Sequence, residues 1–225
     1  MRLPSGDPSP LPHTTRITGR QWLSHDTFTL NLERPPGFCF VAGQRIGILV
    51  GPHERDYSLI PGKTPEGLEL LVRSVPGGFV SSHLSTCPLE DPVKFTGPSG
   101  HFIHRPSTRA AVLVATGTGV APFAAMCRSG LRGFVMLHGG HASRDLHYRK
   151  LVESAAALYV PSLSGPSSSS PEGTFSGRVT RYLQSRLDAG EYDFYLAGRR
   201  EMVADVVAIV DARFPSSRVY SEIFF

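Results

Sequence analysis

Up to about residue 100, the chain alternates short runs of hydrophobic or β-branched residues with glycines, prolines and polar turn residues. Runs of this kind are typical of strands, and their spacing favours an antiparallel barrel of about six strands. One helix is expected among them: after two glycines, Ser81 begins a short segment and carries a hydroxyl suited to capping. The strand-like runs are residues 14–23, 27–35, 44–51, 55–62 and 67–75.

From Arg109 onward, strand-like runs alternate with helical segments. This alternation predicts a parallel sheet with helices covering both of its faces. The strands are expected at residues 110–116, 133–139, 158–163, 192–198 and 217–225, and the helices at residues 120–130, 144–156, 178–187 and 200–214.

The two patterns predict two domains, because 225 residues are enough for two small cores. An antiparallel β-barrel is expected over residues 1–104, followed by a doubly wound α/β domain with a parallel sheet over residues 105–225. The boundary is expected within residues 101–108, where the sequence resembles a linker.

Composition narrows the classes of function. The net charge is +4, without a dense basic block interleaved with aromatic residues, which argues against nucleic acid as a partner. No apolar run approaches the roughly 20 residues that span a bilayer, and no secretory signal is seen, so a cytoplasmic location is expected. The three cysteines are widely separated and match no metal-cluster spacing, so no metal is expected on this chain.

The strongest local motif in the second half runs from Thr116 to Pro122, with the sequence TGTGVAP. It follows the first parallel strand and opens a helix. Gly117 and Gly119 allow close approach of a pyrophosphate, and the helix start favours negative charge. A tight turn without ligand is the alternative. The motif departs from the dinucleotide fingerprint G-x-G-x-x-G, because Pro122 stands where the third glycine would be.

In the first half, Arg55, Tyr57 and Ser58 lie on one strand-like run, and Gly78 to Ser81 follow about twenty residues later. A guanidinium, a ring and a hydroxyl at alternate and adjacent strand positions can all contact one extended ligand. Alone, this pattern is weak, since a surface strand can carry it by chance.

Taken in order, the motifs resemble the ferredoxin–NADP reductase family over residues 14–225. The resemblance implies a flavin-binding barrel and an NAD(P)-binding α/β domain whose cofactors meet in the cleft between them. The matching segments are Arg55 to Ser58, Gly78 to Ser81, Gly97 to Phe102, Thr116 to Pro122, Leu196 to Gly198, and Glu222 to Phe225.

For the first domain, the resemblance implies FAD as cofactor. Arg55 would pair with its pyrophosphate in a bidentate geometry that lysine cannot provide. Tyr57 would lie against the isoalloxazine, and Ser58 would reach the ring edge near N5. Val80 and Ser81, with Gly78 before them, would hold the remaining phosphates at the helix start. The alternative for these residues is ordinary barrel packing.

For the second domain, the resemblance places Thr116, Gly117, Gly119, Pro122 and Gly198 at the nicotinamide and pyrophosphate of NAD(P). Two arginines that follow the second and third strands, Arg144 and Arg178, favour NADPH, with NADH possible. Each is equally compatible with a solvated helix end. No acidic residue is plainly placed to bind a ribose 2′-hydroxyl, which also favours NADPH.

The last residues carry a further implication of the resemblance. Glu222 matches an acidic residue near flavin N5, and Phe224 and Phe225 match aromatics that stack on the flavin until nicotinamide displaces them. A strand end that packs both rings into the core is the alternative. The family often has cysteine where this chain has Ala197, so a thiol that assists hydride transfer is missing.

The activity implied is hydride transfer between NAD(P)H and FAD, and single-electron transfer between FAD and an acidic carrier, ferredoxin or flavodoxin. Two alternatives remain: the reductase component of a multicomponent oxygenase, and a flavin-bearing electron-transfer subunit of a larger complex.

Overall fold

The first half of the chain folds into a seven-stranded antiparallel sheet. The structure is a computed structural model that describes residues 12–166 and 173–224, and the elements counted below lie within them. The strands are β1 (His13–Trp22), β2 (Thr27–Glu33), β3 (Arg45–Val50), β4 (His53–Ser58), β5 (Ile60–Pro61), β6 (Gly67–Arg73) and β7 (Pro92–Ser99). One helix, α1 (Phe79–Thr86), lies between β6 and β7.

This sheet closes into a barrel. Its strand order is β4-β3-β7-β1-β2-β6-β5, so the two ends of the order are β4 and β5, and only Leu59 separates them in the chain. Leu59 is fully buried, together with alternate residues of the strands such as Ile46, Ile48 and Phe95. The barrel interior is therefore a packed hydrophobic core.

The second half forms a six-stranded sheet in which every pair of neighbours is parallel. Its order is β11-β10-β9-β8-β12-β13, so the chain starts at β8, moves outward to β11, and returns to the other side of β8. The carboxyl ends of β8 and β12 thus meet at the point where the strand order reverses, which is where such sheets bind ligands. The strands are β8 (Ala110–Thr116), β9 (Val135–Gly140), β10 (Leu158–Leu163), β11 (Phe175–Ser176), β12 (Tyr192–Arg199) and β13 (Arg218–Phe224).

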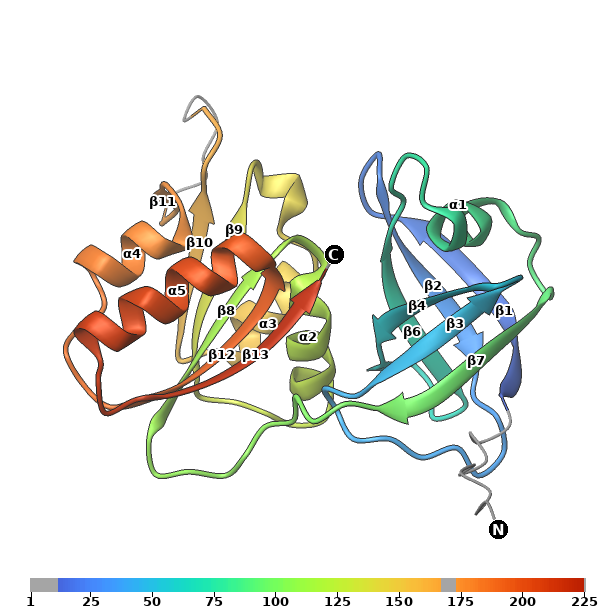
Figure 1. Ribbon diagram of the computed structural model, residues 1–225, viewed down its shortest axis with the longest axis horizontal. Helices are drawn as coiled ribbons and strands as arrows, with labels where there is room; N and C mark the ends of the chain where they lie inside the picture. Colours follow the sequence, from blue (N-terminus) through green and yellow to red (C-terminus); the bar gives the residue numbers. More distant parts are fainter. Residues whose placement is uncertain (1–11, 167–172, 225) are drawn as a thin grey trace, which may run out of the picture.

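Helices cover both faces of this sheet, as the alternating pattern predicts. On one face, α2 (Ala121–Arg128) and α3 (Arg149–Ala155) pack in one hydrophobic cluster. On the other face, α4 (Val179–Ser185) and α5 (Arg200–Arg213) pack in a second cluster. Figure 1 shows α2 on the side of the sheet that faces the barrel, and α4 and α5 on the opposite side. The predicted fold class, a barrel followed by a doubly wound α/β domain, is confirmed.

Local boundaries differ from the sequence prediction in three places. The run at residues 55–62 is split between β4 and β5, and β7 was not among the predicted runs. The helix expected from Arg144 begins only at Arg149, after a 3-10 turn at Ser143–Asp145, because Tyr148 adopts a left-handed backbone conformation with φ of 55°.

The segment between the two sheets, residues 100–109, has no regular secondary structure. Phe102 is buried against Phe123 and Tyr195, in the core of the second domain. The backbone N–H of Arg105 donates a hydrogen bond to the Tyr195 hydroxyl. This segment is therefore packed onto the second sheet. The domain boundary drawn from the sequence stays a prediction.

The two domains share a buried interface. Ile60 and Leu71 of the barrel belong to the same hydrophobic cluster as α2. Glu69 of β6 is only 2% exposed. Its Oε1 accepts a hydrogen bond from the Tyr148 hydroxyl at 2.6 Å and forms an ion pair with Nη2 of Arg128 at 2.9 Å. A carboxylate of one domain is thus neutralised by an arginine of the other and accepts a hydrogen bond from a tyrosine of the same domain as that arginine.

Candidate active site

The strand β4 divides its residues between two faces. Arg55 and Tyr57 pair with Ile48 and Ile46 across β3, so they share the face that carries those core side chains. Tyr57 packs against the barrel core, and burial raises its pKa to about 12. Ser58 is one residue further on, so it lies on the opposite face, where it is buried. Ser58 therefore faces the second domain, whereas Arg55 and Tyr57 lie on the face of β4 that they share with the core side chains of β3.

The start of α1 lies beside this strand. The rings of His53, at the beginning of β4, and Phe79, the first residue of α1, are 4.4 Å apart. Arg55 lies two residues after His53 on the same face of the strand. The guanidinium and the helix N-terminus therefore come to the same end of the barrel.

The expectation that Ser81 caps this helix is wrong. The helix begins two residues earlier, and its N-cap is Gly78, without a side-chain hydrogen bond. The Ser81 hydroxyl instead donates to the carbonyl of Gly78 and accepts from the N–H of Val75. Val80 is buried in the barrel core. No side chain caps the first turn and no acidic residue lies in it, so its N–H groups suit an anionic ligand.

In the second domain, the TGTGVAP turn lies at the switch point of the sheet. β8 ends at Thr116, a 3-10 turn spans Gly117–Val120, and Pro122 lies in the first turn of α2, a position that proline favours. A Cβ at Gly119 would lie 2.2 Å from the carbonyl oxygen of Ala197 in β12. Only glycine therefore allows the turn and β12 to approach so closely.

Gly198 completes the same arrangement from β12. Its φ is +146°, and a Cβ there would lie 2.4 Å from Oγ1 of Thr116. That hydroxyl is buried and has no hydrogen-bond partner among the described residues. An unpartnered hydroxyl beside two glycines, at the carboxyl ends of neighbouring parallel strands, fits a nucleotide that supplies the missing partner.

Glu222 of β13 joins the two domains. Its Oε2 accepts a hydrogen bond from Ser58 at 3.5 Å, and its Oε1 lies 3.1 Å from Nη1 of Arg45 on β3. In the sheet, Glu222 pairs with Ala197, whose carbonyl contacts Gly119. The structure thus connects the strand of Tyr57 and Ser58 to the TGTG turn through one buried carboxylate.

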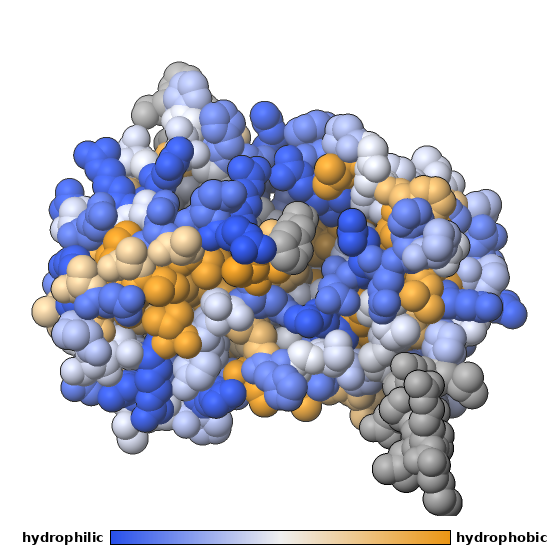
Figure 2. Space-filling view, in the orientation of Figure 1, coloured by the Kyte–Doolittle hydropathy of each residue, from blue (hydrophilic) through white to orange (hydrophobic). Residues whose placement is uncertain are grey.

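Next to this contact lies a hollow of about 400 Å³ at the junction. Figure 2 shows hydrophilic residues on both sides of the junction, and hydrophobic residues over β13 and α5 of the second domain. The hollow is lined by Arg45, His101, Phe102, Tyr220, Ser221, Glu222 and Ile223.

Arg144 and Arg178 are both exposed at the carboxyl edge of the second sheet. Arg144 lies in the 3-10 turn after β9, and Arg178 immediately precedes α4, beyond β10 and β11. Since β9 and β10 are parallel neighbours, their following segments share one edge. The structure therefore places the two arginines on the edge that also carries the TGTG turn.

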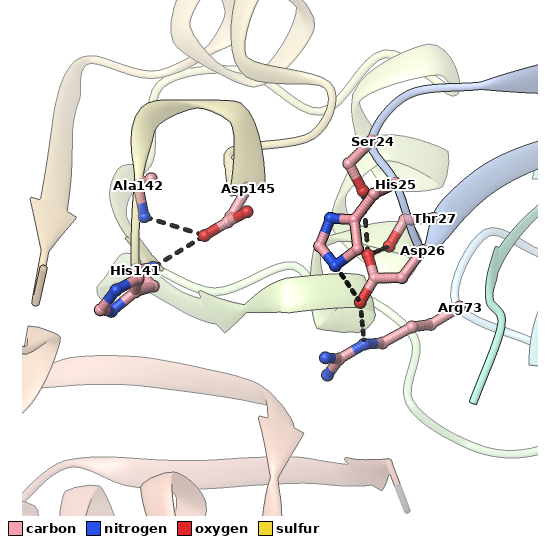
Figure 3. Close-up of polar contacts among 8 residues, drawn as sticks. All are labelled: Ser24, His25, Asp26, Thr27, Arg73, His141, Ala142 and Asp145. Carbon is pink, nitrogen blue, oxygen red and sulfur yellow. Dashed lines mark hydrogen bonds and ion pairs between the residues drawn. The ribbon is translucent and has the colours of Figure 1, made fainter. Parts of the chain in front are cut away.

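Two loops, one from each domain, face each other beside this edge (Figure 3). In the second domain, Asp145 accepts hydrogen bonds from the backbone N–H groups of His141 and Ala142. In the barrel, burial would raise the pKa of Asp26, but hydrogen bonds from Thr27, Arg73 and Ser24 hold it at about 2.

His147 follows the second-domain loop, two residues after Asp145, and is buried. Burial lowers its pKa, while the charges of Asp145 and Asp26 act in the opposite direction.

Phe224 is partly buried at the end of β13 and packs against the hydrophobic cluster that contains α2. The ring is not fully buried, and the flavin-stacking role of Phe224 stays a prediction. Phe225 lies outside the described residues.

The sequence alone did not point to Arg45, Glu69 or Asp26 as residues of the site. Arg45 and Glu69 occupy strand positions where alternation predicts a solvated side chain. Asp26 had a signal in its turn sequence, Ser-His-Asp-Thr, because serine and aspartate favour turns.

The described residues contain no group of three histidine, cysteine, aspartate or glutamate side chains arranged to hold a metal ion. Over the same part of the chain, no helix is both long and apolar enough to cross a membrane.

Comparison with known proteins defines the family. Residues 14–104 match the oxidoreductase FAD-binding domain, and residues 113–208 match the oxidoreductase NAD-binding domain. Ferredoxin–NADP reductase A of Sorangium cellulosum is 30% identical over 217 residues, which cover 83% of this chain and 78% of that protein. The chain belongs to the ferredoxin–NADP reductase family. It therefore combines a domain that binds FAD with a domain that binds a nicotinamide nucleotide.

Another relative in sequence and a solved structure are also similar to this reductase. The toluate 1,2-dioxygenase electron transfer component of Pseudomonas putida is 30% identical over 213 residues, and the chain spans 62% of its length. A crystal structure of a ferredoxin NADP+ reductase from Neisseria gonorrhoeae with bound FAD and NADP superimposes with a TM-score of 0.80, covering 95% of this chain and 99% of that one. At 19% identity, this likeness concerns the fold.

Proposed function

We propose that this reductase transfers hydride between NAD(P)H and FAD, and single electrons between FAD and a ferredoxin or flavodoxin. The observation that carries the proposal is the contact of Glu222 with Ser58 and Arg45. This contact brings the strand of the barrel motif and the glycine turn of the second domain to one junction. Bound FAD supplies the redox chemistry, and the protein supplies binding, orientation and electrostatics.

In the barrel, Arg55 and the N–H groups after Gly78 in the first turn of α1 would hold the FAD pyrophosphate. Tyr57 would lie against the isoalloxazine. Ser58 and Glu222 would lie near the reacting edge of the ring, where hydride transfer requires an approach of about 3–3.5 Å with water excluded.

In the second domain, the TGTG turn with Pro122 and Gly198 would bind the nicotinamide and pyrophosphate, and the nucleotide would give the Thr116 hydroxyl a hydrogen-bond partner. Phe224 and Phe225 would stack on the flavin in the absence of nicotinamide. We also propose a cytoplasmic location.

NADPH is expected to be the preferred donor, because Arg144 and Arg178 lie exposed on the nucleotide edge. Steady-state reduction of an artificial acceptor should give a higher kcat/KM with NADPH than with NADH. Replacing both arginines by alanine should raise KM for NADPH about tenfold or more and leave NADH nearly unchanged, since each charge-assisted hydrogen bond contributes about 1.5–3 kcal/mol. Equal losses with both nucleotides would show that the arginines do not bind the 2′-phosphate.

Arg55→Lys should weaken FAD binding about tenfold or more, because lysine cannot reproduce a bidentate contact. Fluorescence titration of the FAD-free protein with FAD measures the loss. Arg16→Lys, at an exposed position on β1 of the same barrel, is the matched control and should bind FAD as the wild type does. If the two variants bind FAD equally, Arg55 has another role.

A ferredoxin or flavodoxin is the proposed acceptor, and its acidic surface would complement the net charge of +4. A second candidate is an oxygenase system, because the toluate relative is an electron transfer component of a dioxygenase. The rate of NADPH-dependent reduction should be compared for purified ferredoxin, flavodoxin and an oxygenase component. Reaction with the first two should slow as salt is added.

A further inference from the structure

We propose that Arg45 is a positioning residue that holds the Glu222 carboxylate in place against Ser58 across the domain junction. The proposal rests on the proposed function, in which Glu222 lies at the reacting edge of the flavin. It adds a residue that belongs to none of the motifs and comes from the other domain.

The barrel fixes Arg45 from its own side. Arg45 is the first residue of β3 and pairs directly with Ser58 at the end of β4, so the two side chains share one face. Asp56 lies on that same face, two residues before Ser58, and its Oδ2 is 2.8 Å from Nε of Arg45. The guanidinium thus forms an ion pair with Asp56 of its own domain, in which Nε lacks hydrogen-bond geometry, while Nη1 donates a hydrogen bond to Glu222.

Arg45 and Ser58 together position Glu222 through both of its carboxylate oxygens. Oε1 lies 3.1 Å from Nη1 of Arg45, and Oε2 lies 3.5 Å from the hydroxyl of Ser58. The carboxylate is only 7% exposed, whereas the Arg45 side chain is 38% exposed beside the hollow. Figure 1 shows that the start of β3 and the end of β13 lie on the sides of the two domains that face each other. Arg45 therefore orients a carboxylate that its own domain does not carry.

Charged and polar groups of the barrel affect the pKa of Glu222. Burial raises the pKa of Glu222, and the hydrogen bond and charge of Arg45 oppose that rise. On β4, Asp56 raises the pKa further and Ser58 lowers it. His101 and Tyr220 line the same hollow. Arg45 is the cation paired with this carboxylate, so its loss is expected to raise the pKa of Glu222 further.

The test uses the FAD-loaded protein in a His101→Gln background, so that no histidine lines the hollow. Arg45→Gln, Arg45→Lys, Glu222→Gln and the double variant Arg45→Gln/Glu222→Gln are compared. Arg109→Gln is the matched control, since it breaks an arginine–glutamate pair with Glu191 away from the junction. Two quantities are followed against pH: Tm without nucleotide, and the rate of flavin reduction by NADPH.

The expected sign follows from the raised pKa. The folded protein binds the Glu222 proton more tightly than the unfolded chain, so stability is lost as pH rises from the ordinary range of a glutamate through the raised pKa. Arg45→Gln should move the midpoint of this loss upward by about one pH unit or more, and the midpoint of the reduction rate with it. Arg45→Lys should fall between Arg45→Gln and the wild type, and Arg109→Gln should match the wild type.

Each outcome supports or overturns the proposal. Unchanged pH midpoints of Tm and of the reduction rate in Arg45→Gln would overturn it. The same shift of the Tm midpoint in the double variant as in Arg45→Gln alone would also overturn it, because the double variant lacks the Glu222 carboxyl group. A shift in the pH midpoint of Tm without a shift in the midpoint of the reduction rate would overturn the positioning role, because it would show that Arg45 and Glu222 form a structural ion pair only. If Arg45→Gln does not fold, Arg45→Lys decides, and a midpoint at or below that of the wild type contradicts the proposal. If NADPH reduces no flavin at all, the proposed function fails, while Tm still tests the hold of Arg45 on Glu222.

Discussion

Replacing Glu69 by alanine is expected to lower the free energy of unfolding by about 3 kcal/mol. The substitution removes the carboxylate that neutralises Arg128 and accepts from Tyr148, and leaves a largely buried guanidinium without its partner. Breaking a buried pair costs roughly 3–5 kcal/mol, and Arg128 keeps 20% exposure, which favours the lower end. For a chain of this size, Tm should fall by roughly 6–12 °C.

Glu153→Ala is the matched control for this prediction. Glu153 also pairs with an arginine, Arg149, at 3.2 Å, but this pair lies on the exposed surface of α3. Such a pair contributes about 0.5 kcal/mol or less. Equal losses of Tm in the two variants would mean that the Glu69 contact does not hold the domains together. Calorimetric unfolding of both proteins gives the comparison.

Gly119→Ala is expected to weaken NADPH binding about tenfold or more and to lower stability by about 1–3 kcal/mol. The added Cβ would meet the backbone carbonyl of Ala197 at 2.2 Å, so the turn and β12 must move apart. This displaces the N–H groups of the turn and the Thr116 hydroxyl from the nucleotide. Isothermal titration of NADPH measures the affinity, and thermal unfolding measures the stability.

Gly67→Ala serves as control, because a Cβ at Gly67 meets its nearest atom, Cα of Gly62, at an ordinary contact distance of 3.4 Å. It should bind NADPH as the wild type does. If Gly119→Ala also retains full affinity, the glycine turn is a packing feature and the nucleotide binds elsewhere.

The sequence was sufficient for the architecture because periodicity is a local signal. Alternation in the first half and strand-helix alternation in the second half each report which residues face a core. The strand β7 was missed although Val93 and Phe95 alternate as buried residues, because Pro92, Gly97 and Pro98 dominate its composition. The start of α1 was misplaced because a serine was available as a cap, whereas Gly78 takes that position without a side-chain bond.

The site was predictable where it is made of contiguous motifs, and not where it depends on contacts between domains. Ser58 and Glu222 were singled out separately by resemblance, but their contact spans 164 positions of sequence. Arg45 and Glu69 stand in strands where a charged residue normally faces solvent. Their partners, Glu222 and Arg128, lie in the other domain, so only the folded structure reveals that these charges are paired.

The proposed hydride transfer requires one arrangement of the cofactors. A flavin in the barrel and a nicotinamide on the second sheet must meet at the junction that Glu222 bridges. Anaerobic mixing of the FAD-loaded protein with NADPH, with no other protein present, tests this most directly. We predict a yellow protein whose visible flavin absorbance bleaches within a single turnover. A protein that stays colourless after addition of FAD, or a yellow one that NADPH does not bleach, would contradict the account.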